Sequence, residues 1–357
     1  MVEGSVTPKP GEGRPKAIGM ISGGLDSSLA VRMMQSLGFE VKAVSFYTGF
    51  CITETHRRMG GRPRDGAIPR SEPLYAAAEA GVEVELVDIS DEYVDIVTNP
   101  RFGYGANMNP CIDCRIFMMK KAKEIMEAEG AELVFTGEVL GQRPKSQRRD
   151  TLRLIERESG LEGRILRPLS GRHLPPTVAE KDGLIRREDL LSIKGRGRRE
   201  QIRLAEKLGL LEYPQPAGGC CFLTDESYSR RFRDLIENRD TRRYTKDDVV
   251  LLATGRHFRI GPGEKLIVAR TDGENLLLER YAKERWSLRA LEHKGPLALC
   301  EGSPEHQVRH LASRIVARYG KGRDEKQVRI GWVRGEESFE LHVEPFDDDA
   351  LIEPYRL

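Results

Sequence analysis

The sequence predicts an α/β protein: a doubly wound parallel sheet, followed by a helical basic segment and a C-terminal α+β domain. Short apolar runs alternate with helical patterns from Ala17 to about Ser170, which is typical of βαβ units. Residues 246–357 instead show strand-like alternation around one helical pattern. At 357 residues, with 39% hydrophobic and 32% charged residues, the chain is long enough for two or three globular cores.

Composition shifts predict four segments. They are a loose lead-in (1–14), a sheet domain (15–170), a helical basic segment (171–245) and a C-terminal accessory domain (246–357). The lead-in contains prolines and glycines but no apolar core of a signal peptide, and no apolar run approaches the ~18 residues of a membrane span. We therefore expect a cytoplasmic protein, in which cysteines serve metal or catalytic chemistry rather than a disulfide framework.

The sheet domain is expected to contain five strands and at least two helices. The strands are expected at residues 17–21, 40–46, 82–89, 132–136 and 164–168. A helix between the first two strands ends at Gly38, and a second helix spans residues 113–129. Parallel strands connected by helices place their ligands at the carboxyl edge of the sheet.

Later elements follow different patterns. The basic segment shows helical patterns at 194–210 and 227–238, interrupted by Pro175-Pro176 and by the loop at 214–219. In the C-terminal domain we expect strands at 265–270, 275–279, 327–333 and 338–343, and a helix near 305–319. An acidic tail extends from 336 to 353.

The loop Ser22-Gly23-Gly24-Leu25-Asp26-Ser27-Ser28 lies between a predicted strand and a predicted helix. Glycines allow a tight turn whose N–H groups approach an anion, and the helix start adds the positive end of its dipole. Serine hydroxyls donate hydrogen bonds, and the Asp26 carboxylate suits the Mg²⁺ that accompanies a nucleotide. No lysine follows the glycines, so the loop differs from that of phosphoryl-transfer NTPases.

This SGGxDS loop resembles that of the ATP pyrophosphatase (PP-loop) family, which cleaves ATP between the α and β phosphates. The resemblance implies an adenine nucleotide alpha hydrolase-like fold and an ATP site that uses Mg²⁺. The ATP-binding residues expected on this basis are Ser22, Gly23, Gly24, Asp26, Ser27, Ser28, Phe46 and Gly137.

A second motif, Asn109-Pro110-Cys111-Ile112-Asp113-Cys114, opens the helix at 113–129, and Gly218-Gly219-Cys220-Cys221-Phe222 follows far along the chain. The positive end of the helix dipole lowers the pKa of a cysteine thiol at a helix start, which favours the thiolate form. One alternative is a chance pair of cysteines in a thiol-rich loop, and another is a structural zinc site, although the sequence offers no second CxxC for it. Sulfur chemistry is favoured over both, in two forms. One is a [4Fe–4S] cluster on Cys111, Cys114 and either Cys221 or Cys220. The other is persulfide and disulfide exchange between Cys114 and Cys221.

Together these motifs resemble PP-loop tRNA thiolation enzymes. NPxxxC and GxCF are similar to segments of 2-thiouridine synthetases, which implies catalytic roles for Cys114 and Cys221 beside Asp26. TGExLGQ and LRPL resemble 4-thiouridine synthetases, and CxxC with a distant cysteine resembles cluster-dependent enzymes. Cys111 departs from the persulfide-type 2-thiouridine pattern, so the resemblance favours a [4Fe–4S] cluster. The implied activity is a tRNA sulfurtransferase that adenylates a base carbonyl oxygen and then replaces that oxygen with sulfur. The donor would be sulfide or a persulfide carrier.

Glu138 and Gln142 follow the fourth strand and are expected either to orient the base or adenylate or to be satisfied within their own loop. Residues 143–243 contain 24 Lys or Arg and 16 Asp or Glu, a surplus of 8, although the whole chain carries only +2. This surplus predicts a tRNA-binding surface. Its expected members are Arg143, Lys145, Arg148, Arg149, Lys194, Arg196, Arg198 and Arg199.

The C-terminal domain carries little chemistry of its own. Gly255-Arg256-His257-Phe258 and residues 266–275 resemble an RNA-associated module of ribosome quality-control factors. An accessory or dimerisation role is the alternative, and a homodimer would then be the assembly. The alternative function for the whole chain is a PP-loop enzyme acting on a small molecule, by sulfur insertion or AMP-forming amidation, which would not need the basic surplus.

Overall fold

The computed structural model describes residues 13–51, 71–210, 213, 221–239 and 241–357. The chain forms two compact units, Met1–Thr224 and Asp225–Leu357. The sequence predicted boundaries after residues 170 and 245. Because the observed division falls after Thr224, most of the basic segment belongs to the same unit as the parallel sheet. Within the described part of the chain, none of the helices combines the length and apolar character that a bilayer span requires.

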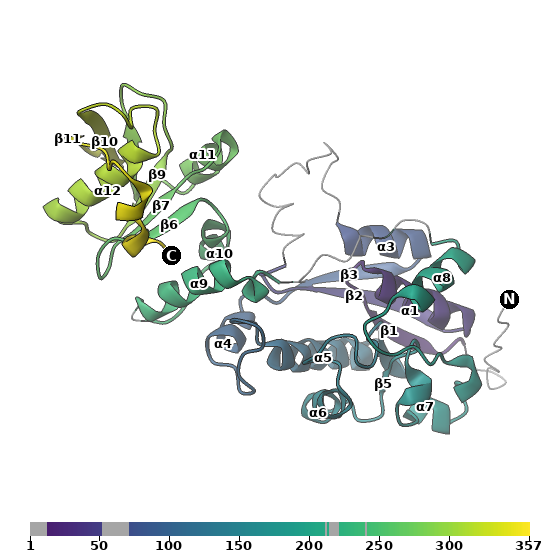
Figure 1. Cartoon of the computed structure of the whole chain (residues 1–357). Coiled ribbons are helices and arrows are strands. Elements are labelled where there is room, and N and C mark those ends of the chain that lie inside the picture. The colour runs from purple at the N-terminus through teal and green to yellow at the C-terminus, as the bar shows by residue number, and fades with distance from the viewer. Residues whose placement is uncertain (1–12, 52–70, 211–212, 214–220, 240) are drawn as a thin grey trace. The chain divides into compact units, whose positions relative to one another are not determined.

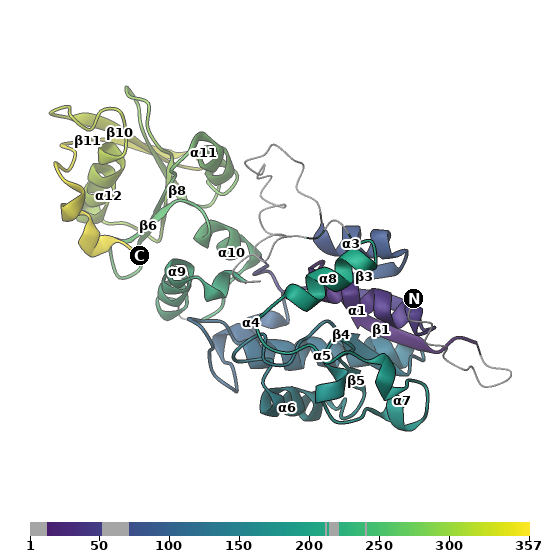
Figure 2. The same ribbon diagram turned by 45° about the vertical axis from the view of Figure 1, so that its right-hand side comes forward.

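The first unit contains a parallel five-stranded sheet in the order β3-β2-β1-β4-β5 (Figures 1 and 2). Its strands are β1 (Lys16–Met20), β2 (Glu40–Tyr47), β3 (Glu83–Asp88), β4 (Leu133–Thr136) and β5 (Ile165–Leu166). Its helices are α1 (Leu25–Ser36), α3 (Glu72–Ala80), α4 (Tyr93–Thr98), α5 (Cys111–Ala128), α6 (Arg149–Ser159), α7 (Val178–Lys181) and α8 (Arg199–Lys207). The doubly wound parallel sheet is thereby confirmed.

Alternation along β1 explains the two layers around this sheet. Ala17 packs with α1 and α3 on one face, whereas Ile18 packs with α5 and α6 on the other. Both side chains are fully buried, as expected for the central strand of a sheet covered on both faces. A third cluster packs α8 against α1, since Ala205 meets Leu25 and Leu29. The helix of the basic segment therefore lies directly on the helix that follows the glycine loop (Figure 1).

The second unit contains an antiparallel six-stranded sheet in the order β11-β10-β8-β9-β7-β6. Its strands are β6 (Arg256–Arg259), β7 (Lys265–Val268), β8 (Trp286–Ala290), β9 (Ala298–Glu301), β10 (Val328–Arg334) and β11 (Glu337–Val343). Its helices are α9 (Glu226–Glu237), α10 (Lys246–Leu252), α11 (Asp272–Glu279) and α12 (His306–Arg318). Helix α12 covers one face, and α10 with α11 covers the other. This is the expected α+β domain.

One strand expectation in this unit was wrong. Residues 275–279 belong to α11, whose start is capped by the Thr271 side chain accepting from the Glu274 N–H at 3.2 Å. Acidic Asp272 and Glu274 in the first turn favour a helix start. The adjacent pair Leu277 and Leu278 is buried. Two neighbouring buried positions fit the face of a helix better than the alternation of a half-buried strand.

Candidate functional site

The candidate site lies at the carboxyl edge of the parallel sheet. The glycine loop follows β1, the segment Thr48–Cys51 follows β2, and the segment beginning at Gly137 follows β4. Helix α5 returns antiparallel to the strands, so its first turn, with Cys111 and Cys114, begins at this same edge. Topology alone thus gathers both chemistry-bearing motifs at one end of the sheet.

The glycine loop is shaped by its own backbone and serines. Gly23 has a φ of +76°, which glycine adopts without strain, and Gly24 is the N-cap of α1. The Ser27 hydroxyl donates to the Gly24 carbonyl at 2.8 Å, and the Ser28 hydroxyl donates to it at 3.3 Å. Ser22 is exposed. Ser27 and Ser28 therefore fix the loop from inside, while the loop presents Ser22 and the helix start outward.

Gly137 explains how the loop is held from the other side. A Cβ atom at this position would lie 2.4 Å from the Asp26 carbonyl oxygen and 2.5 Å from the Ser27 nitrogen. Real Cβ atoms do not approach backbone this closely. The segment after β4 thus touches the glycine loop backbone to backbone, and only glycine permits this contact. Phe46, at the end of β2, packs into the core on the α5 side of the sheet.

Only one of the two carboxylate oxygens of Asp26 has a hydrogen-bond partner among the described residues. Its Oδ2 accepts from Gln142 Nε2 at 2.7 Å, whereas Oδ1 is buried without a hydrogen-bond partner among the described residues. Gln142 is held in turn by Gln201 of α8, whose Nε2 lies 3.4 Å from Gln142 Oε1 and whose side chain is 0% exposed. An orphaned carboxylate oxygen beside an anion-binding loop fits a Mg²⁺ ligand, because the cation would supply the missing partner.

Glu138 is part of a buried ion-pair network. Its Oε2 accepts from Arg167 Nε at 3.1 Å, and its Oε1 lies 3.5 Å from Nε of Arg115 on α5. Burial would raise the pKa of Glu138, but the Arg115 and Arg167 charges outweigh it and hold the pKa below its usual value. These contacts favour the loop-carboxylate alternative for Glu138. Gln142, by contrast, reaches the glycine loop directly.

The cysteine motifs have different partners. In the first turn of α5, Asp113 between the two cysteines accepts from the Arg101 and Phe102 N–H groups at 3.0 Å each, which is a structural role. The second motif packs against the lead-in to α5, since Met108 N–H donates to the Leu223 carbonyl at 3.2 Å. Cys220 lies outside the described residues. In the ranges that are described, no three His, Cys, Asp or Glu side chains converge as ligands of one metal.

Sequence reasoning missed Cys51. This residue forms a single antiparallel β-bridge with Cys221, and the Phe222 N–H donates to the Phe50 carbonyl at 3.0 Å. The thiol-bearing strand at Cys221 therefore lies against the segment that leaves β2. The signal in the sequence was positional, because Cys51 closely follows the carboxyl end of a predicted strand.

The two basic stretches also meet. Leu140 and Lys194 form a parallel bridge, with the Gly195 N–H donating to the Leu140 carbonyl at 2.7 Å, and the Ser170 hydroxyl donates to the Ile193 carbonyl. Most of the expected RNA-binding side chains are exposed and Arg198 is half-buried. The exposed members are Arg143, Lys145, Arg148, Arg149, Lys194, Arg196 and Arg199. We call the seven exposed residues together with Arg198 the basic surface.

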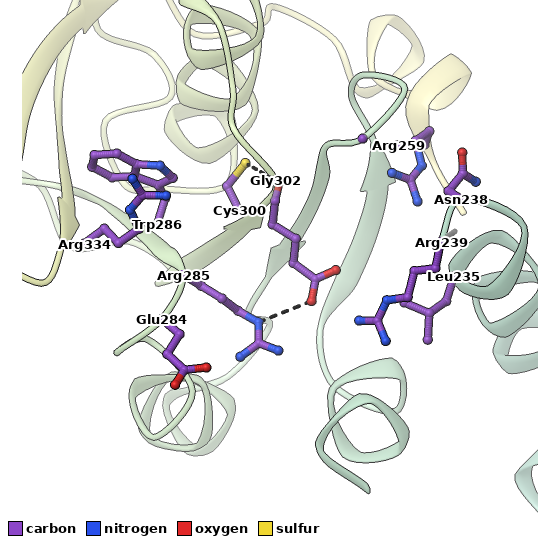
Figure 3. A pocket seen from close by; sticks show the side chains of 12 residues that line it. Leu235, Asn238, Arg239, Arg259, Glu284, Arg285, Trp286, Cys300, Gly302 and Arg334 are labelled. Atoms are coloured by element: carbon purple, nitrogen blue, oxygen red, sulfur yellow. Dashed lines mark hydrogen bonds and ion pairs between the residues drawn. The ribbon is translucent and has the colours of Figure 1, made fainter. Parts of the chain in front are cut away.

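The second unit contains a cavity of about 330 Å³ whose lining includes four arginines from different elements (Figure 3). Each arginine has an acidic partner: Arg239 with Asp248, Arg259 with Asp234, Arg285 with Glu301 and Arg334 with Glu337, at 2.6 to 3.2 Å. Burial raises the pKa of the Cys300 thiol in this lining to about 12. The cavity is thus a polar pocket whose four arginines each pair with a carboxylate, of which only Glu301 belongs to the lining.

Known families match both units. Residues 13–174 match the family described as thiamine biosynthesis protein (ThiI), and residues 255–356 match the family described as NFACT protein RNA binding domain. The first match contains the glycine loop, the five parallel strands and the Cys111–Cys114 motif. Most of the first unit is thus similar to the ThiI family, and we call this unit the PP-loop domain after its glycine loop.

Curated relatives resemble less than half of the chain. A probable tRNA sulfurtransferase of Thermococcus kodakarensis is 26% identical over 44% of this chain and 37% of its own length. One from Thermoanaerobacter sp. is 30% identical over 36% of this chain and 30% of its length. The tRNA-specific 2-thiouridylase MnmA of Thermotoga sp. is 30% identical over 28% of each chain. The chain therefore spans about a third of the length of the curated relatives it matches.

Solved structures give distant similarities. A 4-thiouridine synthetase–RNA complex with bound ATP is 20% identical, with a TM-score of 0.33, over 55% of this chain and 52% of the other. The C-terminal part of the fibronectin/fibrinogen-binding protein from Streptococcus suis is 13% identical, with a TM-score of 0.27, over 44% of this chain and 77% of the other.

Proposed function

We propose that the chain is an ATP-dependent tRNA sulfurtransferase of the thiouridine synthetase type. The observation that carries this proposal is one sheet edge holding the orphaned Asp26 Oδ1, the Cys111–Cys114 helix start and Cys221. The similarity of residues 13–174 to the ThiI family and the relatives named probable tRNA sulfurtransferases support it.

The residues suit adenylation followed by substitution. The Gly23-Gly24 backbone and the start of α1 would bind the phosphates of ATP, with Asp26 holding the accompanying Mg²⁺. The base carbonyl oxygen attacks the α phosphorus and displaces pyrophosphate. This converts a poor leaving group into AMP, which sulfur then displaces from carbon. The hydrogen bond from Gln142, which the buried Gln201 supports from behind, orients the Asp26 carboxylate that this first step needs.

The sulfur chemistry is the finer part of the proposal. A [4Fe–4S] cluster on Cys111, Cys114 and either Cys221 or Cys220 would take sulfide as its donor. We propose persulfide chemistry at Cys221 and Cys114 as the route, with a persulfide carrier as donor, because Cys221 forms a bridge with a second thiol-bearing residue, Cys51. Iron analysis after anaerobic reconstitution separates the two routes, because persulfide chemistry needs no bound iron.

RNA recognition is proposed for both units. The basic surface presents seven exposed cationic side chains, and the similarity of residues 255–356 to an NFACT RNA binding domain supports a second contact. A homodimer and a cytoplasmic location stay predictions.

The decisive experiment compares nucleosides from the tRNA of cells with and without this gene by mass spectrometry. Loss of one thiolated nucleoside, restored by the intact gene and not by an Asp26→Ala variant, is the expected result. Unchanged thionucleosides, together with no measurable tRNA binding at low salt, would favour the small-molecule alternative.

The basic surface is tested by the quadruple variant K194A/R196A/R198A/R199A. Each lost phosphate contact should lower the slope of log affinity against log salt by about 0.9. The matched control is K120A/K181A, which removes two exposed lysines elsewhere in the same unit. Equal losses in both variants would argue against a specific surface.

A further inference from the structure

The isolated antiparallel bridge between Cys51 and Cys221 places these two residues directly opposite each other. The hydrogen bond from Phe222 N–H to the Phe50 carbonyl flanks the pair rather than joining it, so Cys51 and Cys221 occupy a non-hydrogen-bonded position. In such pairs the Cα atoms lie about 4.5 Å apart and the side chains are at their closest. A disulfide requires Cα atoms about 4.4 to 6.8 Å apart, so this register meets the requirement without backbone movement.

The surroundings of the pair belong to the candidate site. Phe50 is fully buried and anchors the strand before Cys51, while the Thr48 hydroxyl lies 4.0 Å from the Cys51 sulfur. On the other strand, the Thr224 side chain and backbone both bond to the Cys221 carbonyl, at 2.7 and 3.1 Å. The Thr224 carbonyl in turn accepts from Nδ2 of Asn107 at 2.8 Å, and Asn107 lies just before α5. The pair is therefore held rigidly at the sheet edge that carries the glycine loop.

We propose that Cys51 is the resolving thiol of Cys221, and that the two close an intramolecular disulfide during sulfur transfer. The catalytic pair expected from the sequence was Cys114 and Cys221, so the proposal assigns the second role to a residue outside both cysteine motifs. The disulfide itself follows from the strand register. Its use in sulfur transfer rests on the proposed function.

The chemistry balances with a persulfide donor and a dithiol reductant. A donor persulfide passes its outer sulfur to Cys221, which becomes Cys221–S–SH, and the donor leaves as a thiol. The outer sulfur attacks the adenylated carbon, AMP leaves with the bonding electron pair, and the sulfur proton goes to solvent. The Cys51 thiolate then attacks the Cys221 sulfur, breaks the S–S bond and releases the thiocarbonyl product. A dithiol supplies two electrons to reopen the Cys51–Cys221 disulfide.

Disulfide mapping on the full chain tests the register. The reduced protein is treated with a mild thiol oxidant, alkylated and digested, and the cross-linked peptides are identified by mass spectrometry. We expect a dominant Cys51–Cys221 cross-link that survives C220S and disappears in C51S and in C221S. Buried Cys300 serves as an internal control and should be alkylated only after unfolding. A dominant Cys114–Cys221 cross-link, with Cys51 still open to alkylation, would overturn the proposal.

A single-turnover reaction tests the use of the pair. With ATP, tRNA and a stoichiometric persulfide donor, without dithiol, wild type should release thiolated tRNA and retain the Cys51–Cys221 disulfide. C51S should instead accumulate tRNA attached to Cys221 through a disulfide, with at least tenfold less released product until a dithiol is added. Equal release by wild type and C51S would overturn the proposal. If the proposed function fails, wild type yields no thiolated tRNA although oxidation still closes the cross-link, so the two failures are distinguishable.

Discussion

Two clusters of buried polar groups, one in each unit, differ in how far their members are paired. The contrast concerns these clusters and not the whole units, because Nδ1 of His257 in the second unit is also buried without a hydrogen-bond partner in the described structure. At the sheet edge of the PP-loop domain, Asp26 Oδ1 and Gln201 Oε1 are buried without partners in the described structure. In the second unit, Asp234 is shared between Arg259 at 2.6 Å and Lys265 at 3.6 Å, and Asp248 is held by Arg239. The unpaired atoms of the first cluster can still bond to a ligand, whereas the carboxylates of the second cluster are already paired with cations of the fold.

This difference separates a reactive site from a supporting structure. A buried polar atom without a partner lowers the stability of the fold, so such an atom is expected mainly where a ligand supplies the missing partner. Compensated ion pairs hold elements together and have little capacity left for a small ligand. In the second unit, burial and the charges of Lys265 and Arg231 lower the pKa of His257 well below 6.5 and keep it neutral. We therefore expect catalytic losses from the first unit and stability changes from the second.

The largest expected effect is that of Asp26→Ala. Removing the uncommitted carboxylate should reduce formation of AMP and pyrophosphate by about a hundredfold or more, as loss of a preorganised electrostatic contact does. Binding of tRNA should change less than twofold, because the basic surface is untouched. Radiolabelled ATP turnover and filter binding measure the two quantities. A parallel loss of both would mean that the variant is misfolded.

Gly137→Ala comes next. Its Cβ would overlap the Asp26 carbonyl, and because the neighbour is backbone, the glycine loop itself must move. Overpacking of this kind costs about 2 kcal/mol, which corresponds to roughly thirtyfold weaker ATP binding by calorimetry. Gly197→Ala is the matched control, since a Cβ there meets nothing within 4 Å. Unchanged ATP binding in Gly137→Ala would break the link between this contact and the nucleotide site.

Gln142→Ala should have a smaller effect. It removes a hydrogen bond to a carboxylate, worth about 1.5 kcal/mol, and should raise the KM for ATP roughly tenfold. Gln201→Ala acts only through Gln142, so it should have no further effect in the Gln142→Ala background. Steady-state kinetics of the double-mutant cycle measure this coupling. Additive effects would show that Gln201 stabilises the site by another path.

The smallest expected effect tests the second unit through pH. Burial lowers the pKa of Lys265 to about 8, from 10.5 when unfolded. Between these values the unfolded state binds more protons, so stability rises with pH, by about 1 kcal/mol from pH 8 to pH 9. Lys265→Met should remove this rise, and the exposed Lys283→Met should keep it. Both tryptophans of the chain, Trp286 and Trp332, lie in this unit, so their fluorescence in urea reports its unfolding selectively.

Much of the PP-loop domain could be predicted from the sequence. Its strands are short apolar runs separated by helical patterns, and parallel topology then fixes which loops share an edge. The glycine loop was predictable for the same reason, because its residues are consecutive and their chemistry is local. Gly137 and Gln142 could be placed near this loop from their position after a strand.

Long-range contacts could not be predicted in this way. The Cys51–Cys221 pair depends on how a segment after α8 returns to the end of β2, and no local pattern encodes that return. Gln201 looked like one polar residue in a basic helix, yet tertiary packing buries it completely behind Asp26. At residues 275–279, the capping contact of Thr271 outweighed an apparent strand pattern.

The bridge at Cys51 also sets an order of assembly during synthesis. The ribosome delivers β1, the glycine loop and Cys51 early, but Cys221 only after the whole parallel sheet. A nascent or truncated chain ending before residue 221 would contain the nucleotide loop without the partner of Cys51. Such a chain would contain the whole parallel sheet and yet lack one of the two residues of this bridge.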